Sequence, residues 1–416
     1  MNKKKIFNDP VYGFISIHSE LIYEIIDHSY FQRLRRIKQL GLTELIYPGA
    51  LHTRFHHALG AMHLMGLALN TLRSKGHQIS EEEYEAGLIA ILLHDIGHGP
   101  FSHALEFSIL SNISHEKVSF LIIKKLNEQF EGKLELALKI FSNKYERKFF
   151  HQLIESQLDI DRLDYLKRDC FFTGVSEGTV AADRIIKMLD LYNDELVIEE
   201  KGIYSIEHFL NARRLMYWQV YLHKTTVSGE KMLIQIIHRV KKLLQQGQSV
   251  FTTPALKVFL ENKIKIDDLN TNDELLLSFT LLDDLDIWSG IKLWRYSDDK
   301  ILSTLCNMLL NRKLFKVILS NERFQEDVLI EKRKELMKDF DINEEDLEYF
   351  FIHGAVSNSG YLASGEGINI LMKNGEVKDV ADASDLPNIK ALSKIVKKYY
   401  VCFPKNVYLS TFAVSK

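Results

Sequence analysis

Histidines gather in one part of this chain at a density that suits a metal or phosphate site. The sequence has 16 histidines, and nine of them fall between His52 and His115. Neutral imidazole is a common metal ligand, and imidazolium binds anions. The doublet His94-Asp95 ends a nearly continuous apolar segment, residues 84–96, which should therefore be a buried helix. A charged pair buried there must be paired or bound to a metal.

Additional ligands must come from other segments, because adjacent residues of a helix point about 100° apart and cannot complete a coordination shell. Residues 54–60 set the pair His56-His57 ahead of an apolar helix, and one of these two histidines could be structural. Residues 159–165 carry three carboxylates on a predicted helix, with Asp161 and Asp164 three apart on one face. For Asp164, an ion pair with Arg168 at i+4 is favoured over ligation.

Apolar residues recur three or four positions apart through most of the chain, so the elements that must position these groups are predicted to be helices. Residues 151–169 and 207–246 are predicted as long helices. The apolar helix over residues 84–96 should end at Gly97, Gly99 and Pro100. Ser102 and Ser114 are candidate N-caps of the next two helices. Residues 267–286 are acidic and Leu-rich, as in a solvated outer layer.

The C-terminal part changes in character. Residues 368–372 and 376–380 flank Asn374-Gly375, a pattern typical of a hairpin with a type I′ turn. Residues 391–399 are predicted as a helix and residues 400–409 as a last strand. With a linker at residues 245–249, the expected division is a core over 1–246, a helical extension over 247–345 and a small α+β region over 346–416. The fold class is mainly α, with a small C-terminal α+β appendage.

Composition excludes several classes of protein. Hydrophobic residues make up 46% and charged residues 26% of the 416 residues, which is ordinary for a globular protein and excludes disorder. The net charge of −3 lacks the basic excess of a duplex-binding protein, so nucleic acid is not an expected partner. Three cysteines are too few for a disulfide framework. Since no signal peptide or apolar stretch of about 20 residues is visible, we expect a cytoplasmic protein without membrane contact.

Several long motifs occur together. They are FQRLRRIKQLG at residues 31–41, YPGA at 47–50, RFHH at 54–57, HDIGHGPFSH at 94–103 and DIDRLDYLKRDC at 159–170. In combination they resemble the HD-domain phosphohydrolase superfamily, and more narrowly its deoxynucleoside-triphosphate triphosphohydrolase branch. The resemblance covers residues 5–224 and implies an HD-domain helical core.

The resemblance also implies roles for individual residues. The implied metal ligands are His57, His94, Asp95 and Asp161, and this donor set suits Mn, Mg, Fe or Zn. His56 is expected outside the coordination shell. The implied catalytic histidines are His98, His103 and His115, and Glu106, three residues after His103, can face it and raise its pKa. The implied substrate-binding residues are Gln39, Leu40, Arg54, Arg162, Tyr165 and Asp169. The implied allosteric residues are Lys5, Asp27, Gln32 and Arg35.

The predicted activity is metal-dependent hydrolysis of dNTPs, with dGTP favoured, to a deoxynucleoside and tripolyphosphate. The resemblance further implies a nucleotide activator and a homo-oligomer, a dimer of dimers. Two alternatives stay open: another HD-family phosphohydrolase, such as a nucleotidase or a cyclic-dinucleotide phosphodiesterase, and a non-catalytic nucleotide sensor.

Overall fold

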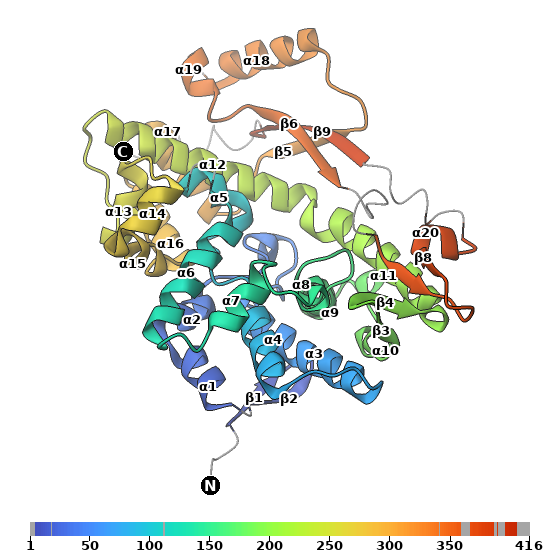
Figure 1. Cartoon of the computed structure of the whole chain (residues 1–416). Helices are drawn as coiled ribbons and strands as arrows, with labels where there is room; N and C mark the ends of the chain where they lie inside the picture. The colour runs from blue at the N-terminus through green and yellow to red at the C-terminus, as the bar shows by residue number, and fades with distance from the viewer. Residues whose placement is uncertain are drawn as a thin grey trace.

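Helices form most of the molecule, so the expected mainly α fold class is confirmed (Figure 1). The computed structural model describes residues 5–17, 19–110, 113–340, 342–358, 367–386, 389 and 396–405, with the backbone alone at positions 103, 107, 340 and 358. The core helices are α1 (Glu20–Asp27), α2 (Ser29–Gln32), α3 (Arg54–Ser74), α4 (Glu81–Leu93), α5 (Ser102–Ile109), α6 (His115–Gln129), α7 (Glu135–Phe141), α8 (Lys148–Ile154), α9 (Ile160–Thr173), α10 (Ala182–Met188), α11 (Ile203–Met216) and α12 (Lys224–Gln245).

Local capping decides where these helices begin and end. α4 opens with a capping box between Ser80 and Glu83 and stops at Leu93, so the His94-Asp95 doublet lies just after the helix. Ser114 is the N-cap of α6, as predicted. Ser102 is not an N-cap, because Phe101 takes that position in a left-handed conformation.

Two predicted long helices are interrupted. The helix expected over 151–169 is wrong, because the side chain of Asp159 caps a new helix, α9, after a break that follows α8. The helix expected over 207–246 is also wrong, because a π-helical turn at Tyr217–Tyr221 separates α11 from α12. The side chain of His223 then caps α12 by accepting a hydrogen bond from the Thr225 amide.

Five helices follow α12 at the left of Figure 1, and the first and last of them pack against it. They are α13 (Pro254–Glu261), α14 (Ile266–Thr271), α15 (Asp273–Thr280), α16 (Asp284–Trp294) and α17 (Lys300–Leu310). Their apolar side chains belong to the same hydrophobic cluster as those of the core helices. The solvated layer expected over 267–286 is wrong at its end, since Asp283 and Asp284 are buried.

The described residues also form three small sheets. β1 (Lys5–Asp9) pairs with β2 (Gly13–Ile17) in an antiparallel hairpin beside α3. The second sheet has the order β3 (Leu189–Tyr192), β4 (Glu195–Glu199), β7 (Asn369–Leu371) and β8 (Val377–Asp379). The third has the order β5 (Lys316–Ser320), β9 (Val396–Phe403) and β6 (Ile352–Asn358). Further helices in the described part of the chain are α18 (Glu326–Phe340), α19 (Glu344–Leu347) and α20 (Val380–Ala383).

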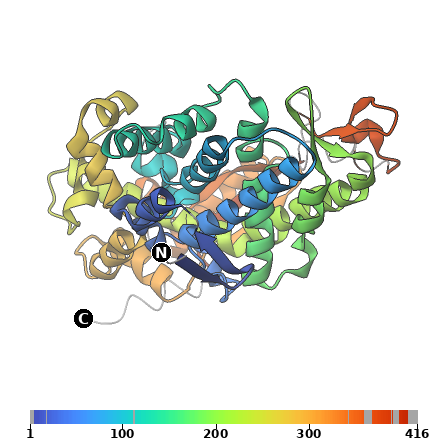
Figure 2. The ribbon, with the colours of Figure 1, turned by 60° about the horizontal axis from the view of Figure 1, so that its bottom comes forward.

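The C-terminal hairpin is present, but its turn differs from the prediction. β7 and β8 pair antiparallel and project at one end of the molecule in both views (Figures 1 and 2). A type I′ turn requires positive φ at both central residues, and of Asn374 and Gly375 only Gly375 has it. The Gly375 amide donates to the Met372 carbonyl at 2.9 Å, as in a three-residue loop that ends in a bulge. The helix predicted over 391–399 is wrong at 396–399, which belong to β9; residues 391–395 and 406–409 lie outside the described residues.

α3 and α9 cross where a glycine leaves room for a buried ion pair. The guanidinium group of Arg168 bonds both oxygens of Asp164, at 2.9 and 3.0 Å, and Asp9 of the N-terminal hairpin at 2.7 Å. The ion pair predicted between Asp164 and Arg168 is therefore confirmed. A Cβ atom at Gly60 would lie 2.1 Å from both the Arg168 Nη2 and the Asp164 Oδ1.

We therefore expect Gly60→Ala to lower the free energy of unfolding by about 3–5 kcal/mol, because the new methyl group must separate a buried ion pair. Urea denaturation measures this. Gly66→Ala on the same helix is the matched control, since its Cβ would come no closer than 3.1 Å to the Tyr84 hydroxyl and alanine favours helix. Equal stability of the two variants would contradict the role of the Asp164–Arg168 pair.

Candidate metal centre and substrate cavity

Three helices bring four acidic and imidazole groups to one point. The His57 Nε2 from α3, the His94 Nε2 after α4 and a carboxylate oxygen of Asp161 from α9 all lie within 4.8 Å of one another. Asp161 Oδ1 is 3.0 Å from His57 Nε2 and 3.4 Å from His94 Nε2. Asp95 joins them, with one oxygen 3.4 Å from His94 Nε2 and the other 3.8 Å from His57 Nε2. The four residues predicted as metal ligands therefore converge.

The surroundings of the two imidazoles fit a bound cation. The Nδ1 of His57 is 2.8 Å from Asp164 Oδ2, and the Nδ1 of His94 is 2.6 Å from the Ile91 carbonyl. Each Nδ1–H can be donated outward, which leaves the Nε2 lone pair directed at the centre. Burial opposes a charge on His57, but hydrogen bonds to Asp161 and Asp164 outweigh it and raise its pKa to about 10. A site that holds positive charge this strongly, with two imidazoles and two carboxylates, fits a divalent Mn, Mg, Fe or Zn ion.

A second cluster of titratable groups lies beside the first. The rings of His98 and His115 are stacked with centroids 3.7 Å apart, and His98 Nε2 is 3.2 Å from Asp95 Oδ1. Burial and the nearby Arg54 hold the pKa of His98 well below its usual value. Burial also opposes a charge on His115, but its hydrogen bond to Glu106 outweighs this and raises its pKa. The pair therefore combines one neutral ring with one that readily carries a proton, an arrangement that suits acid–base chemistry.

Glu106 serves the second cluster directly. Its Oε1 accepts hydrogen bonds from the backbone amide and the Nδ1 of His115, both at 2.8 Å. The side chain of His103 lies outside the described residues. The pairing expected between Glu106 and His103 therefore stays a prediction.

One cavity of about 450 Å³ adjoins both clusters. Every residue predicted to bind substrate lines it: Gln39, Leu40, Arg54, Arg162, Tyr165 and Asp169. Its other lining residues are Thr43, Asp95, His98, His115, Asp161, Tyr217, Tyr221, Leu222, Thr226 and Glu230. Segments that are more than a hundred residues apart in the sequence therefore share one hollow.

The guanidinium groups of the cavity hold unused hydrogen-bond donors. Arg54 is bonded to Asp95 and, at 2.8 Å, to the hydroxyl of Ser102. Arg162 is bonded to Asp159 and the Ser156 carbonyl. The Nε of each arginine is buried without a hydrogen-bond partner among the described residues. Such donors suit a phosphate group.

Asp169 and Gln39 form a polar wall of the cavity. Asp169 is buried and lies 2.7 Å from the His52 Nε2 and 2.8 Å from the Tyr221 hydroxyl. The Oε1 of Gln39 is buried and has no hydrogen-bond partner in the described part of the chain. Buried polar atoms are normally satisfied, so this oxygen is available to a ligand.

Several of these roles were not predicted from the sequence. The contact of Asp164 with His57, the contact of His52 with Asp169 and the position of Glu230 in the cavity all depend on tertiary packing. His56 lies outside the metal cluster, as expected: its Nδ1 accepts a hydrogen bond from the Thr53 amide and caps α3.

The four predicted allosteric residues lie away from the cavity. Lys5 is on β1 with its ammonium over the Tyr23 ring, and Asp27 ends α1. Gln32 accepts a hydrogen bond from the Arg35 Nε at 2.8 Å. None of them lines the cavity.

Within the described residues, no helix is long and apolar enough to cross a membrane.

We expect Asp164→Asn to weaken binding of Mn²⁺ roughly 10- to 100-fold, because the neutral amide orients and polarises the His57 ring less strongly than a carboxylate. Titration calorimetry on the metal-free protein measures it. Asp183→Asn, which affects only an exposed ion pair with Lys167, is the control and should bind as the wild type does. Unchanged affinity in Asp164→Asn would mean that this carboxylate does not support the centre.

Comparisons with known proteins agree with this arrangement. The HD domain matches residues 54–169, and the HD associated region matches residues 180–253. The uncharacterized protein YwfO of Bacillus subtilis is 32% identical over 98% of this chain and 94% of its own length. The crystal structure of a phosphohydrolase from Bacteroides thetaiotaomicron has a TM-score of 0.93 and 50% identity, over 97% of this chain and all of that one. A deoxynucleoside triphosphate triphosphohydrolase SAMHD1 homolog of Dictyostelium discoideum is 27% identical over 72% of this chain and 61% of its own. The chain belongs to the HD-domain phosphohydrolase family.

Proposed function

We propose that this chain is a metal-dependent triphosphohydrolase that converts a dNTP to a deoxynucleoside and tripolyphosphate. The observation that carries the proposal is the single cavity in which the candidate metal centre, two arginines and the polar wall of Gln39 and Asp169 lie together. A triphosphate, a sugar and a reacting phosphorus each find matching chemistry there. The similarity to the Dictyostelium triphosphohydrolase supports the same reading.

Different residues of the chain bind the triphosphate, stabilise its charge and protonate the leaving group. A divalent cation bound by the four ligands would supply Lewis acidity toward an α-phosphate oxygen and activate a water nucleophile. Arg54 and Arg162 bind the triphosphate through planar guanidinium groups. His98 and His115 stabilise the charge on the equatorial oxygens, and His103 protonates the departing 5′-oxygen. In-line displacement requires His103 to lie opposite the attacking water.

The sugar is recognised at the polar wall. The 3′-hydroxyl donates its one proton to Asp169, which His52 and Tyr221 hold in place, and its oxygen accepts a hydrogen bond from the side-chain amide of Gln39, whose Oε1 has no partner among the described residues. The Tyr165 ring lies against the 2′-carbon, so a ribose hydroxyl must clash or be buried without a partner. This supports a deoxyribonucleotide as the substrate.

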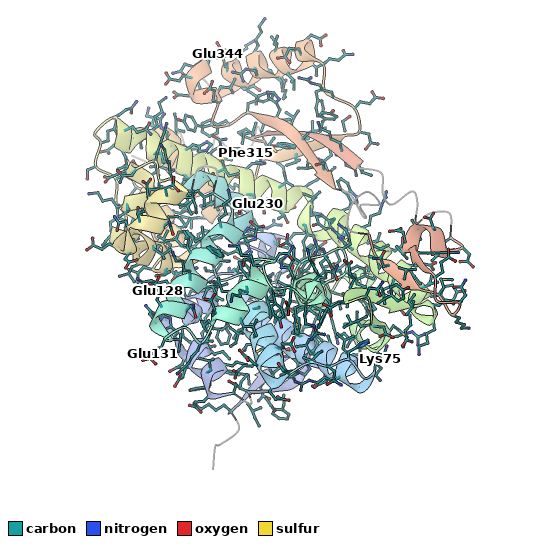
Figure 3. All side chains as sticks on the ribbon, viewed as in Figure 1. Lys75, Glu128, Glu131, Glu230, Phe315 and Glu344 are labelled. Carbon is teal, nitrogen blue, oxygen red and sulfur yellow. The ribbon has the colours of Figure 1, made fainter. Side chains whose placement is uncertain are left out.

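Glu230 favours guanine as the base. It lies on α12 (Figure 3) and lines the cavity, and no hydrogen bond or ion pair joins it to another described residue. Burial raises its pKa to about 7, the mark of a carboxyl group that lacks a partner. Guanine presents two adjacent N–H donors, N1 and the 2-amino group, to a carboxylate. The other three bases lack this pair of donors.

The proposal includes a nucleotide activator and a homo-oligomer, a dimer of dimers. Lys5 and Arg35 carry positive charge, and Asp27 and Gln32 offer hydrogen-bonding groups, all within the N-terminal elements and outside the cavity. A nucleotide shared between subunits there would stabilise the active assembly only by binding it more tightly than the inactive one.

Two alternatives are less well supported. A nucleotidase or a cyclic-dinucleotide phosphodiesterase has no need for two arginines and a deoxyribose wall together. A nucleotide sensor that had lost catalysis would not need the full set of ligands and the paired His98 and His115.

The products distinguish these possibilities. Purified protein with Mn²⁺ is given each dNTP or rNTP in turn, and the products are resolved by anion exchange. The dNTPs should release tripolyphosphate and a deoxynucleoside, and the rNTPs should react much more slowly. The double variant His94→Ala/Asp95→Ala should lose both bound metal and turnover, because His57 and Asp161 alone hold an ion poorly. Release of monophosphate or pyrophosphate, or stoichiometric metal in the double variant, would contradict the proposal.

We expect Glu230→Gln to lower kcat/KM for dGTP by roughly 10- to 100-fold, because an amide leaves one guanine donor unpaired at about 1–3 kcal/mol. The value for dATP should change little, which makes dATP hydrolysis by the same variant the internal control. Equal losses on all four dNTPs would mean that Glu230 supports the fold and not the choice of base.

A further inference from the structure

The turn between α15 and α16 reaches from the helical extension to the walls of the cavity. Arg33, which is fully buried, donates to the Leu282 carbonyl of this turn at 3.0 Å and to the Ile96 carbonyl, next to the metal ligand Asp95, at 2.7 Å. Its guanidinium group also lies 5.3 Å from the centre of the Phe279 ring. The extension is thus bonded to the segment that carries the HD doublet.

Asp284, the first residue of α16, bridges two segments of the active-site region. One carboxylate oxygen accepts the amide of Phe101 and the other accepts the amide of Lys38, each at 2.9 Å. The carboxylate is buried, with 3% of the residue exposed. Lys38 immediately precedes Gln39 of the polar wall, and Phe101 immediately precedes α5.

Phe101 needs such support because its backbone is strained. It has φ 45° and ψ 45°, a left-handed conformation that a bulky residue rarely adopts. The Phe101 amide donates a hydrogen bond to Asp284, and the Phe101 ring packs edge-on against Trp288 of α16, with centroids 5.8 Å apart. α16 therefore holds both the backbone and the side chain of the residue from which α5 begins.

We propose that Asp284 is a positioning residue through which the helical extension sets the geometry of the substrate cavity. By holding Lys38 it fixes Gln39 for the sugar. By holding Phe101 it fixes α5, whose Ser102 bonds Arg54 and whose Glu106 bonds His115. The activity readout of this proposal rests on the proposed function.

Only a carboxylate satisfies both amides. Each oxygen of an ionised carboxylate accepts a hydrogen bond, whereas an asparagine offers one acceptor and one donor. In Asp284→Asn the amide group must therefore face an N–H of Lys38 or Phe101, and that segment must move. Displacements of about 1 Å near a reacting group can cost roughly 10²-fold in rate.

The test compares Asp284→Asn with Asp283→Asn. Asp283 pairs with Arg36 and caps α16 through the Leu285 amide, a cap that asparagine also forms, and it is not bonded to the Lys38 or Phe101 amides. For Asp284→Asn we expect kcat for dNTP hydrolysis to fall roughly 10²-fold, with Mn²⁺ binding and the melting temperature near those of Asp283→Asn. Hydrogen exchange resolved by mass spectrometry should speed up at residues 38–40 or 101–105 in Asp284→Asn alone.

Wild-type kcat, KM and local exchange in Asp284→Asn would overturn the proposal, as would an equal loss in Asp283→Asn. If Asp284→Asn does not fold, Trp288→Leu removes the ring contact and leaves the carboxylate. That variant should speed exchange at 101–105 but not at 38–40, and no change there contradicts the role of α16. If the wild type hydrolyses no dNTP, the proposed function fails, while the exchange data still decide whether Asp284 holds both segments.

Discussion

The buried chain of charges from Asp9 through Arg168 and Asp164 to His57 is the interaction on which the active-site region depends. Arg168 has no exposed side-chain surface and is bonded to two carboxylates, one from the N-terminal hairpin and one from its own helix. Removing one partner of such a buried group leaves an uncompensated charge. Burial raises the pKa of Asp164, but Arg168 and His57 outweigh it and lower the value to about 2. Asp164 therefore stays ionised, and its stabilisation is lost only as pH falls from the usual carboxyl range through that value.

Through this row of buried charges, the stability of the fold depends on the same groups that set the charge at the candidate metal centre. The same Asp164 that pairs with Arg168 accepts the Nδ1–H of His57, so the ring orientation depends on the packing of α3 against α9. Without a cation, the surrounding carboxylates keep His57 protonated, with a pKa of about 10. A metal held at the proposed centre would compete with this proton for the same position, so its binding would release a proton and stabilise the folded state.

The sequence allowed prediction of the charged and imidazole groups that lie in segments expected to be buried. An apolar helix that ends in His94-Asp95, and three carboxylates at 159–164, indicated a metal site because buried charge needs a partner. Of the four ligands implied by the family resemblance, His57, His94 and Asp161 cluster tightly, and Asp95 lies within 4 Å of both imidazoles. Helix breaks were not predicted, because Asp159 and His223 act as N-caps within segments whose periodicity continues on both sides. The strands of the β1–β2 hairpin and the first two strands of the second sheet were not predicted, because each strand is only four or five residues long. The burial of Asp283 and Asp284 depends on contacts with residues about 180 to 250 positions away, which local pattern does not reveal.

At the edge of the cavity, one catalytic cation is proposed to be held by His57, His94, Asp95 and Asp161. Crystals grown with Mn²⁺ and a non-hydrolysable dGTP analogue, measured at the manganese absorption edge, test it most directly. We expect an anomalous peak enclosed by these four side chains, with the α-phosphate of the analogue beside it and the base at Glu230. A peak enclosed by Asp95, His98 and His115, or no peak between His57 and Asp161, would contradict it.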